Sequence, residues 1–204
     1  MTKGKSKMDK DLDLEGLSRD EQLEKLQANL QTLAKPVYDF DSYGLEDLWS
    51  EVLPNLWQGG TDDFDTIYEA TPYTPTEEAP IGITKKDFDV VVTAYAWAKP
   101  VDWGVKEVRF GFYDADMTDI NMGALYRIVN DVHADWKRGD KVLVRCQAGW
   151  NRSGLITALI LMKEGYTADE AIALIRKTRS PHALCNKKFE KFLKDLPQPE
   201  KKKK

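Results

Sequence analysis

Two side chains with complementary chemistry lie six residues apart, Cys146 and Arg152. A cysteine thiolate is a strong nucleophile, and a guanidinium can bind two phosphate oxygens at once. The hydroxyl of Ser153, directly after the arginine, can donate a hydrogen bond to the sulfur when the sulfur must leave. We therefore interpret residues 146–153 as a phosphate pocket with a nucleophile at its base.

The residues on either side predict the elements that position this loop. Val142–Val144 are a short apolar run typical of a buried strand. A helix is predicted to begin near Ser153, with these apolar residues along it: Leu155, Ile156, Leu159, Ile160 and Met162. The loop therefore faces a helix N-terminus, where unpaired backbone N–H groups and the helix dipole favour an anion. The same field favours a thiolate over a thiol at Cys146.

The segment Val144–Ser153 resembles the signature loop of the cysteine-dependent protein phosphatases, most closely the dual-specificity branch. That pattern is His-Cys, five residues, then Arg-Ser/Thr, with a glycine at the fourth place, here Gly149. The resemblance implies catalytic roles for Cys146, Arg152 and Ser153. The mechanism that it implies needs no metal or other cofactor. It also implies that phosphate is bound by Gln147, Ala148, Gly149, Trp150, Asn151 and Arg152. One departure is Arg145, where the family usually has histidine.

A carboxylic acid is the second requirement, because an alkoxide or phenoxide leaves poorly unless it is protonated. In the dual-specificity family this acid is an aspartate some thirty residues before the cysteine, followed six residues later by an apolar residue. Asp114 matches, being 32 residues ahead of Cys146 with Ile120 six residues on. Asp116 is the alternative, and Asp119 is expected to support the N-terminus of the following helix.

The rest of the pattern predicts an α/β fold with a central, mainly parallel sheet flanked by helices on both faces, because strand and helix signals alternate. Strands are expected within 51–60, 87–94 and 105–110, and a helix between Met122 and Gly139. The segment 51–60 resembles the opening strand of dual-specificity phosphatases. Thr167–Glu170 is a capping box, and Asn186 is expected to cap a last helix. Cys146 then lies at the carboxyl end of a central strand.

Four regions are predicted along the chain: a disordered tail over 1–17, a helix and linker over 18–48, the phosphatase-like domain over 49–196, and a basic disordered tail over 197–204. The helix has a leucine stripe after a capping box at Ser18–Glu21. This stripe over residues 18–35 could bind a partner, although packing on the domain's own surface is the simpler expectation.

Composition narrows the functional classes. With 34 acidic and 30 basic residues the net charge is −4, so no global cationic field favours nucleic acid or a membrane surface. Two cysteines, the absence of a secretory signal pattern at Met1–Lys7 and the absence of an 18-residue apolar run predict a cytoplasmic protein. Two histidines without a cysteine cluster argue against a zinc site or a Ser-His-Asp triad.

The predicted function is a tyrosine or dual-specificity phosphomonoester hydrolase that acts through a phosphocysteine. The neutral loop residues, with Trp150 as a pocket wall or stacking surface, favour a phosphorylated protein or a small aryl phosphate. Three alternatives stay open: a catalytically weak phosphate-binding module, suggested by Arg145, a phosphatase of non-protein phosphoesters, and a rhodanese-like sulfurtransferase. Cys185 is expected to be a core or loop residue rather than a redox partner of Cys146.

Overall fold

The computed structural model describes residues 47–61 and 83–199, together with Glu21. The chain divides into two units, Met1–Tyr43 and Gly44–Lys204, and the fold below is that of the second. The predicted tail over 1–17 lies outside the described residues, as do residues 18–48 apart from Glu21, Asp47 and Leu48. Within the described ranges no helix is both long and apolar enough to cross a bilayer.

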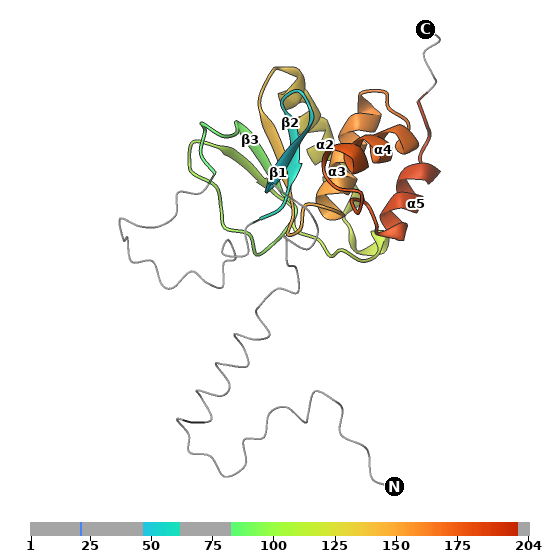
Figure 1. The fold of residues 1–204 in the computed structure, drawn as a ribbon, viewed down its shortest axis with the longest axis horizontal. Coiled ribbons are helices and arrows are strands. Elements are labelled where there is room, and N and C mark those ends of the chain that lie inside the picture. The colour runs from blue at the N-terminus through green and yellow to red at the C-terminus, as the bar shows by residue number, and fades with distance from the viewer. Residues whose placement is uncertain (1–20, 22–46, 62–82, 200–204) are drawn as a thin grey trace. The chain divides into compact units, whose positions relative to one another are not determined.

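The core of the fold is a five-stranded sheet in the order β1-β2-β5-β3-β4 (Figure 1). Its strands are β1 (Trp49–Leu53), β2 (Leu56–Gly59), β3 (Val90–Thr93), β4 (Lys106–Arg109) and β5 (Val142–Arg145). β1 pairs antiparallel with β2, and the other three pairings are parallel. β5 and β3 are buried along their whole length, whereas β4 is an edge strand with exposed ends. The mainly parallel sheet with a central strand before Cys146 is therefore confirmed.

The segment expected as one opening strand is a hairpin instead. β1 and β2 are separated by Pro54 and Asn55, and the register shifts next to this turn. Pro54 has no N–H to donate, and Asn55 has a positive φ of 64°, which an extended strand cannot contain. The amide of Asn55 donates to Oε1 of Glu51 at 3.0 Å. The chain therefore reverses, and β2 lies beside β5.

Four α-helices and one short 3-10 helix complete the described part of the fold. They are η5 (Met117–Asp119), α2 (Met122–Lys137), α3 (Arg152–Lys163), α4 (Ala168–Thr178) and α5 (Lys187–Asp195). Thr167 and Glu170 form the predicted capping box of α4. Asn186 caps α5 by accepting hydrogen bonds from the amides of Lys188 and Phe189. Both predicted caps are confirmed.

The two faces of the sheet are covered differently. The helices α2–α5 share one apolar core with the face that carries Val90, Val92, Val142 and Val144. On the other face Val91 and Leu143 pack with Phe88, Trp49 and Trp57. The α/β class with flanking helices is confirmed, but helices were expected on both faces, and in the described part of the chain aromatic side chains from strands and loops cover the second face instead. Among the described residues, all four α-helices pack on the first face (Figure 1).

The parallel strands bring three loops to one edge of the sheet. β3, β4 and β5 run in the same direction, so the segments after Thr93, Arg109 and Arg145 leave from the same edge. In open α/β sheets this carboxyl edge is where ligands bind. The loops after β3 and β4 therefore lie at the same edge of the sheet as Cys146.

Candidate active site

Cys146 follows β5 directly and is only 2% exposed. Its amide donates to the carbonyl of Gly59 at 3.2 Å. Its Sγ lies 3.3 Å from Oγ of Ser153, which is buried in the first turn of α3. The sulfur and the serine hydroxyl that the sequence analysis paired are therefore within hydrogen-bonding distance.

The backbone of residues 147–151 is held by its carbonyl groups. Each carbonyl in this run accepts a hydrogen bond from surrounding structure. The donors, in order, are the amide of Thr61 at 2.9 Å, Nη2 of Arg179 at 3.4 Å, Nε2 of Gln58 at 3.0 Å, the amide of Leu184 at 3.3 Å and the amide of Leu155 at 2.8 Å. In a trans peptide the next N–H points opposite to the carbonyl, and no described peptide bond is cis. The amides of residues 148–152 therefore point away from these donors, toward the inside of the loop.

Gly149 has two reasons to be glycine. Its φ is +73°, in the left-handed region that side chains disfavour. A Cβ at this position would also lie 2.4 Å from the carbonyl carbon of Gly59 and 2.5 Å from the amide nitrogen of Gly60. The loop therefore packs directly against the end of β2, which fixes its curvature.

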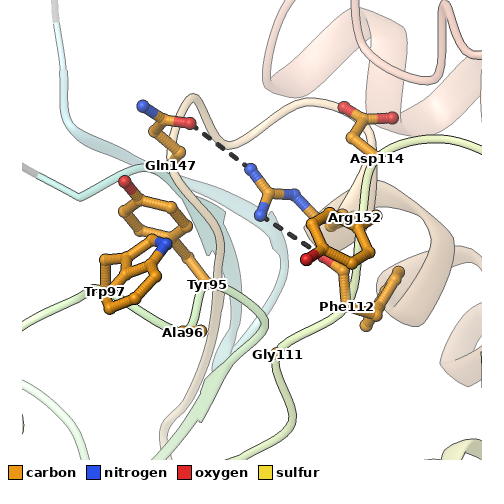
Figure 2. A pocket seen from close by; sticks show the side chains of 9 residues that line it. Tyr95, Ala96, Trp97, Gly111, Phe112, Asp114, Gln147 and Arg152 are labelled. Atoms are coloured by element: carbon orange, nitrogen blue, oxygen red, sulfur yellow. Dashed lines mark hydrogen bonds between the residues drawn. The ribbon is translucent and has the colours of Figure 1, made fainter.

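Arg152 begins α3 and reaches back across the loop. Its Nη1 donates to the carbonyl of Phe112 and its Nη2 to Oε1 of Gln147, both at 3.5 Å (Figure 2). These are long, weak hydrogen bonds. The Nε is buried and has no acceptor among the described residues. The guanidinium therefore has donors to offer a bound anion.

Arg179 is a second cation at the loop, and it is buried, only 4% exposed. Its Nη1 donates to the carbonyl of Asp47 at 2.8 Å and its Nη2 to that of Ala148. Burial lowers the pKa of this guanidinium, while the negative charges of Cys146 and Asp47 act in the opposite direction. Sequence reasoning gave Arg179 no role in the site. Arg179 therefore donates to the loop from a buried position, close enough to Cys146 for an electrostatic interaction.

Asp114 is exposed at the rim of the site and is held by two side-chain amides. Its Oδ2 accepts from Nδ2 of Asn151 at 3.0 Å, and its Oδ1 accepts from Nδ2 of Asn186 at 2.8 Å. Asn151 belongs to the cysteine loop and Asn186 caps α5. The structure therefore brings Asp114 to the cysteine loop from a segment 37 residues away in sequence.

The other two loop aspartates have different surroundings. Asp116 caps η5 by accepting from the amide of Thr118, and Lys188 lies 3.6 Å from it. The Thr118 amide, with help from Lys188, lowers the pKa of Asp116. Asp119 lies within η5, and Asn121, rather than Asp119, caps α2 by accepting from the amide of Ala124 at 3.0 Å.

A pocket of about 410 Å³ opens over this arrangement (Figure 2). Its lining comprises Tyr95, Ala96, Trp97, Gly111, Phe112, Tyr113, Asp114, Gln147 and Arg152. Tyr95 and Trp97 lie on one side of Arg152, and Phe112 and Asp114 on the other. Sequence reasoning missed the four aromatic residues of the lining. The available signal was their place directly after predicted parallel strands.

The remaining predicted phosphate-binding residues contribute mainly backbone. Ala148 and Gly149 form the turn of the loop, and Asn151 contacts Asp114. The Trp150 ring packs against that of His182, with ring centroids 5.6 Å apart, and Trp150 is not part of the pocket lining. Cys185 is exposed, with its Sγ 3.4 Å from Nδ2 of Asn151, and both cysteines are free.

A cysteine directly after a central strand, followed by a tight loop and a helix that begins with an arginine, is the arrangement expected of a cysteine-dependent phosphatase. Residues 83–198 match the model of the dual specificity phosphatase catalytic domain, and the chain belongs to this family. The predicted family and its phosphatase class are thereby confirmed.

Individual relatives agree with this assignment. The chain is 30% identical over 94 residues to a putative tyrosine phosphatase, 123R, of Invertebrate iridescent virus 6; the match spans 44% of this chain and 66% of that relative. Human DUSP28 has a similar fold, with a TM-score of 0.53 at 20% identity over 73% of this chain and 97% of that one. The Orf virus tyrosine phosphatase OH1 gives 0.52 at 16% identity over 82% and 95%.

Proposed function

We propose that this chain hydrolyses phosphomonoesters through a covalent phosphocysteine at Cys146. The proposal rests on the hydrogen bonds that the carbonyls of residues 147–151 accept from surrounding groups. Because these carbonyls point away from the pocket, the amides that follow them point toward the space beside the buried sulfur. Inward amides with the guanidinium of Arg152 form a cradle for three equatorial phosphoryl oxygens. Such preorganised donors stabilise the charge that develops in the transition state.

In the first step the Cys146 thiolate attacks phosphorus, the S–P bond forms, and the P–O bond to the leaving group breaks. Asp114 gives its proton to the departing oxygen. The contacts from Asn151 and Asn186 support Asp114 in this role, because they hold its carboxyl group at the pocket rim. Asp116 is the weaker candidate, since its carboxylate caps η5 and its pKa is lowered.

In the second step Asp114 takes a proton from water, the water oxygen attacks phosphorus, and the S–P bond breaks. The electron pair returns to the sulfur, where the Ser153 hydroxyl donates a hydrogen bond at the 3.3 Å separation found here. Phosphate then leaves with the enzyme unchanged.

The substrate class that fits best is a phosphorylated tyrosine in a protein, or a small aryl phosphate. Four aromatic side chains line the pocket, and flat rings pack well between such walls. The viral relative described as a putative tyrosine phosphatase is consistent with this choice. A non-protein phosphoester is the second candidate, because the pocket itself recognises only phosphate and a ring.

The cellular location and the domain bounds are further parts of the proposal. A cysteine nucleophile must stay reduced, which supports a cytoplasmic setting. The apolar core runs from Val52 to Leu193, which supports the predicted domain over 49–196. The partner-binding helix over 18–35 stays a prediction, since all of it except Glu21 lies outside the described residues.

Hydrolysis of p-nitrophenyl phosphate tests the proposal. We expect turnover by the wild type, turnover reduced by at least about 10³-fold in Cys146→Ser, and near-normal turnover in the matched control Cys185→Ser. Equal activity in Cys146→Ser would refute it. Phosphate binding without any wild-type turnover would instead support the non-catalytic module, and release of thiocyanate from thiosulfate and cyanide would support a sulfurtransferase.

A further inference from the structure

Arg145 replaces the family's usual histidine directly before the nucleophile, and its side chain lies on the face of β5 opposite the helices. Val142 and Val144 pack with the helices, whereas Leu143 packs in the other core. Strand residues alternate between faces, which places Arg145 with Leu143. Arg145 is nevertheless 2% exposed, so its charge must be satisfied by buried partners.

Those partners lie on two neighbouring segments. Nε of Arg145 donates to Oγ1 of Thr93 at 3.0 Å, and Nη2 donates to the carbonyl of Lys99 at 2.6 Å. Nη2 also lies 3.3 Å from Oε1 of Glu107 on β4. The residue before the nucleophile thus connects β5 to the segment that follows β3.

Glu107 joins a second arginine to the same segment. Its Oε1 accepts from Oγ1 of Thr93 at 2.6 Å and from Nη1 of Arg109 at 2.9 Å. Nη2 of Arg109 donates to the carbonyls of Ala96 and Ala98, at 3.1 and 2.6 Å. We call Arg145, Glu107 and Arg109 the arginine clamp, because together they hold three carbonyl groups within residues 96–99.

The clamped segment is one wall of the pocket. Tyr95, Ala96 and Trp97 line it, and the Tyr95 ring lies 5.1 Å from the Arg152 guanidinium (Figure 2). The facing segment touches this wall at Gly111, where an added Cβ would lie 2.9 Å from Cβ of Ala96. The width between the walls therefore depends on where the backbone of residues 95–97 is held.

We propose that the arginine clamp determines specificity, with Arg145 positioning the Tyr95–Trp97 wall against the aryl group of the substrate. The inference rests on the proposed function and extends it from the phosphate cradle to the leaving group. A wall contact acts on the ring in the ground state and the transition state alike, so it lowers KM rather than raising kcat. Inorganic phosphate occupies only the cradle and has no ring to pack on the wall, so it senses the wall only through the Tyr95 ring beside Arg152.

The test compares KM for p-nitrophenyl phosphate with the inhibition constant of inorganic phosphate in each variant. In Arg145→Met we expect KM to rise about tenfold and the phosphate constant to change less than about twofold. Arg109→Ala should change the same ratio in the same direction by about threefold, and because Arg109 is exposed its removal leaves no buried cavity. Arg127→Ala, an exposed arginine on α2, is the matched control and should leave both constants unchanged.

Two results would overturn the inference. One is an unchanged ratio in Arg109→Ala, which decides the matter alone if Arg145→Met does not fold. The other concerns Arg145→Met: the acid limb of its pH–rate profile shifts while the ratio of KM to the phosphate inhibition constant stays unchanged. This would mean that Arg145 acts on the sulfur. If the wild type shows no turnover, the proposed function fails, while the ratio can still be measured from dissociation constants of the two ligands.

Discussion

The two loops that meet at the pocket are held in opposite ways. Residues 147–151 are fixed through backbone carbonyls that accept from β2, α3, Arg179 and neighbouring loops. The loop with Asp114 is exposed, and its carboxylate is held by the side chains of Asn151 and Asn186. Phe112 adds an aromatic contact to Phe189, with ring centroids 6.2 Å apart.

This difference separates the nucleophile and its phosphate-binding loop from the general acid of the proposed reaction. The geometry of the cysteine loop is tied to the fold, because its donors belong to the core of the domain. The geometry of Asp114 depends on a few side chains at the surface. Changes in the cysteine loop should therefore affect folding and turnover together, whereas changes around Asp114 should affect turnover alone.

Among the variants that compare the two loops, the largest effect is expected for Gly149→Ala. The added Cβ would overlap the backbone of Gly59 and Gly60, and the φ of +73° is strained for alanine. We expect a loss of roughly 1–3 kcal/mol in the free energy of unfolding and at least about 10²-fold in kcat/KM. Denaturant unfolding and p-nitrophenyl phosphate kinetics measure the two losses. Gly139→Ala is the control: its φ is also positive, at 101°, but nothing lies within 4 Å of the added Cβ, so stability alone should fall.

A smaller and purely kinetic effect is expected when the support of Asp114 is removed. Asn186→Ser keeps a side-chain cap for α5, since serine caps about as well as asparagine, but it loses the amide donor to Asp114. We expect kcat to fall about tenfold for an alkyl phosphate and less for p-nitrophenyl phosphate, whose leaving group needs little protonation. Asn151→Ala should lower kcat in the same direction, and it should also lower stability, because Oδ1 of Asn151 accepts from the amide of Asn186 at 3.0 Å.

Exposed Asn130→Ala on α2 is the control for these two variants and should change neither substrate. Equal losses for both substrates in Asn186→Ser would contradict the role of this contact in proton transfer. The comparison between the loops would then rest on stability alone.

The smallest effect concerns α5, which carries the Asn186 cap. Lys194, Lys187 and Arg176 lower the pKa of Glu190 from 4.5 to about 2. Between these values the unfolded chain binds a proton that the folded chain does not, so the stabilisation is complete above pH 4.5 and is lost as the pH falls toward 2. The free energy of unfolding, measured from neutral pH down to about pH 3, should be higher for wild type than for Glu190→Gln, and this difference should shrink as the pH falls. A constant gap would contradict it.

The cysteine loop could be predicted because its signal is local. Cys146 and Arg152 lie within one strand–loop–helix unit, where sequence spacing fixes spatial proximity. The caps at Thr167 and Asn186 are local in the same sense. The hairpin at Pro54–Asn55 could also have been predicted, since proline followed by asparagine interrupts strand pairing.

The pocket walls could not be predicted from local spacing. Tyr95 and Phe112 reach the site only because β3 and β4 end at the same edge of the sheet as β5, and the only signal in the sequence is that each residue follows a predicted strand. Arg145 bonds to Lys99 and Glu107, which are 46 and 38 residues away in sequence. Trp150 is the opposite case: its position in the loop predicted a pocket wall, but its ring packs on His182 instead.

The most direct measurement is to trap the intermediate. Asp114→Asn should still form the phosphocysteine with p-nitrophenyl phosphate, which needs little acid, but should lose it slowly because the base for water is gone. Acid quench followed by peptide mass spectrometry should find one phosphoryl group on the Cys146 peptide, with Asp116→Asn accumulating none. A burst of p-nitrophenol with the phosphoryl group on another residue, or on none, would contradict the account.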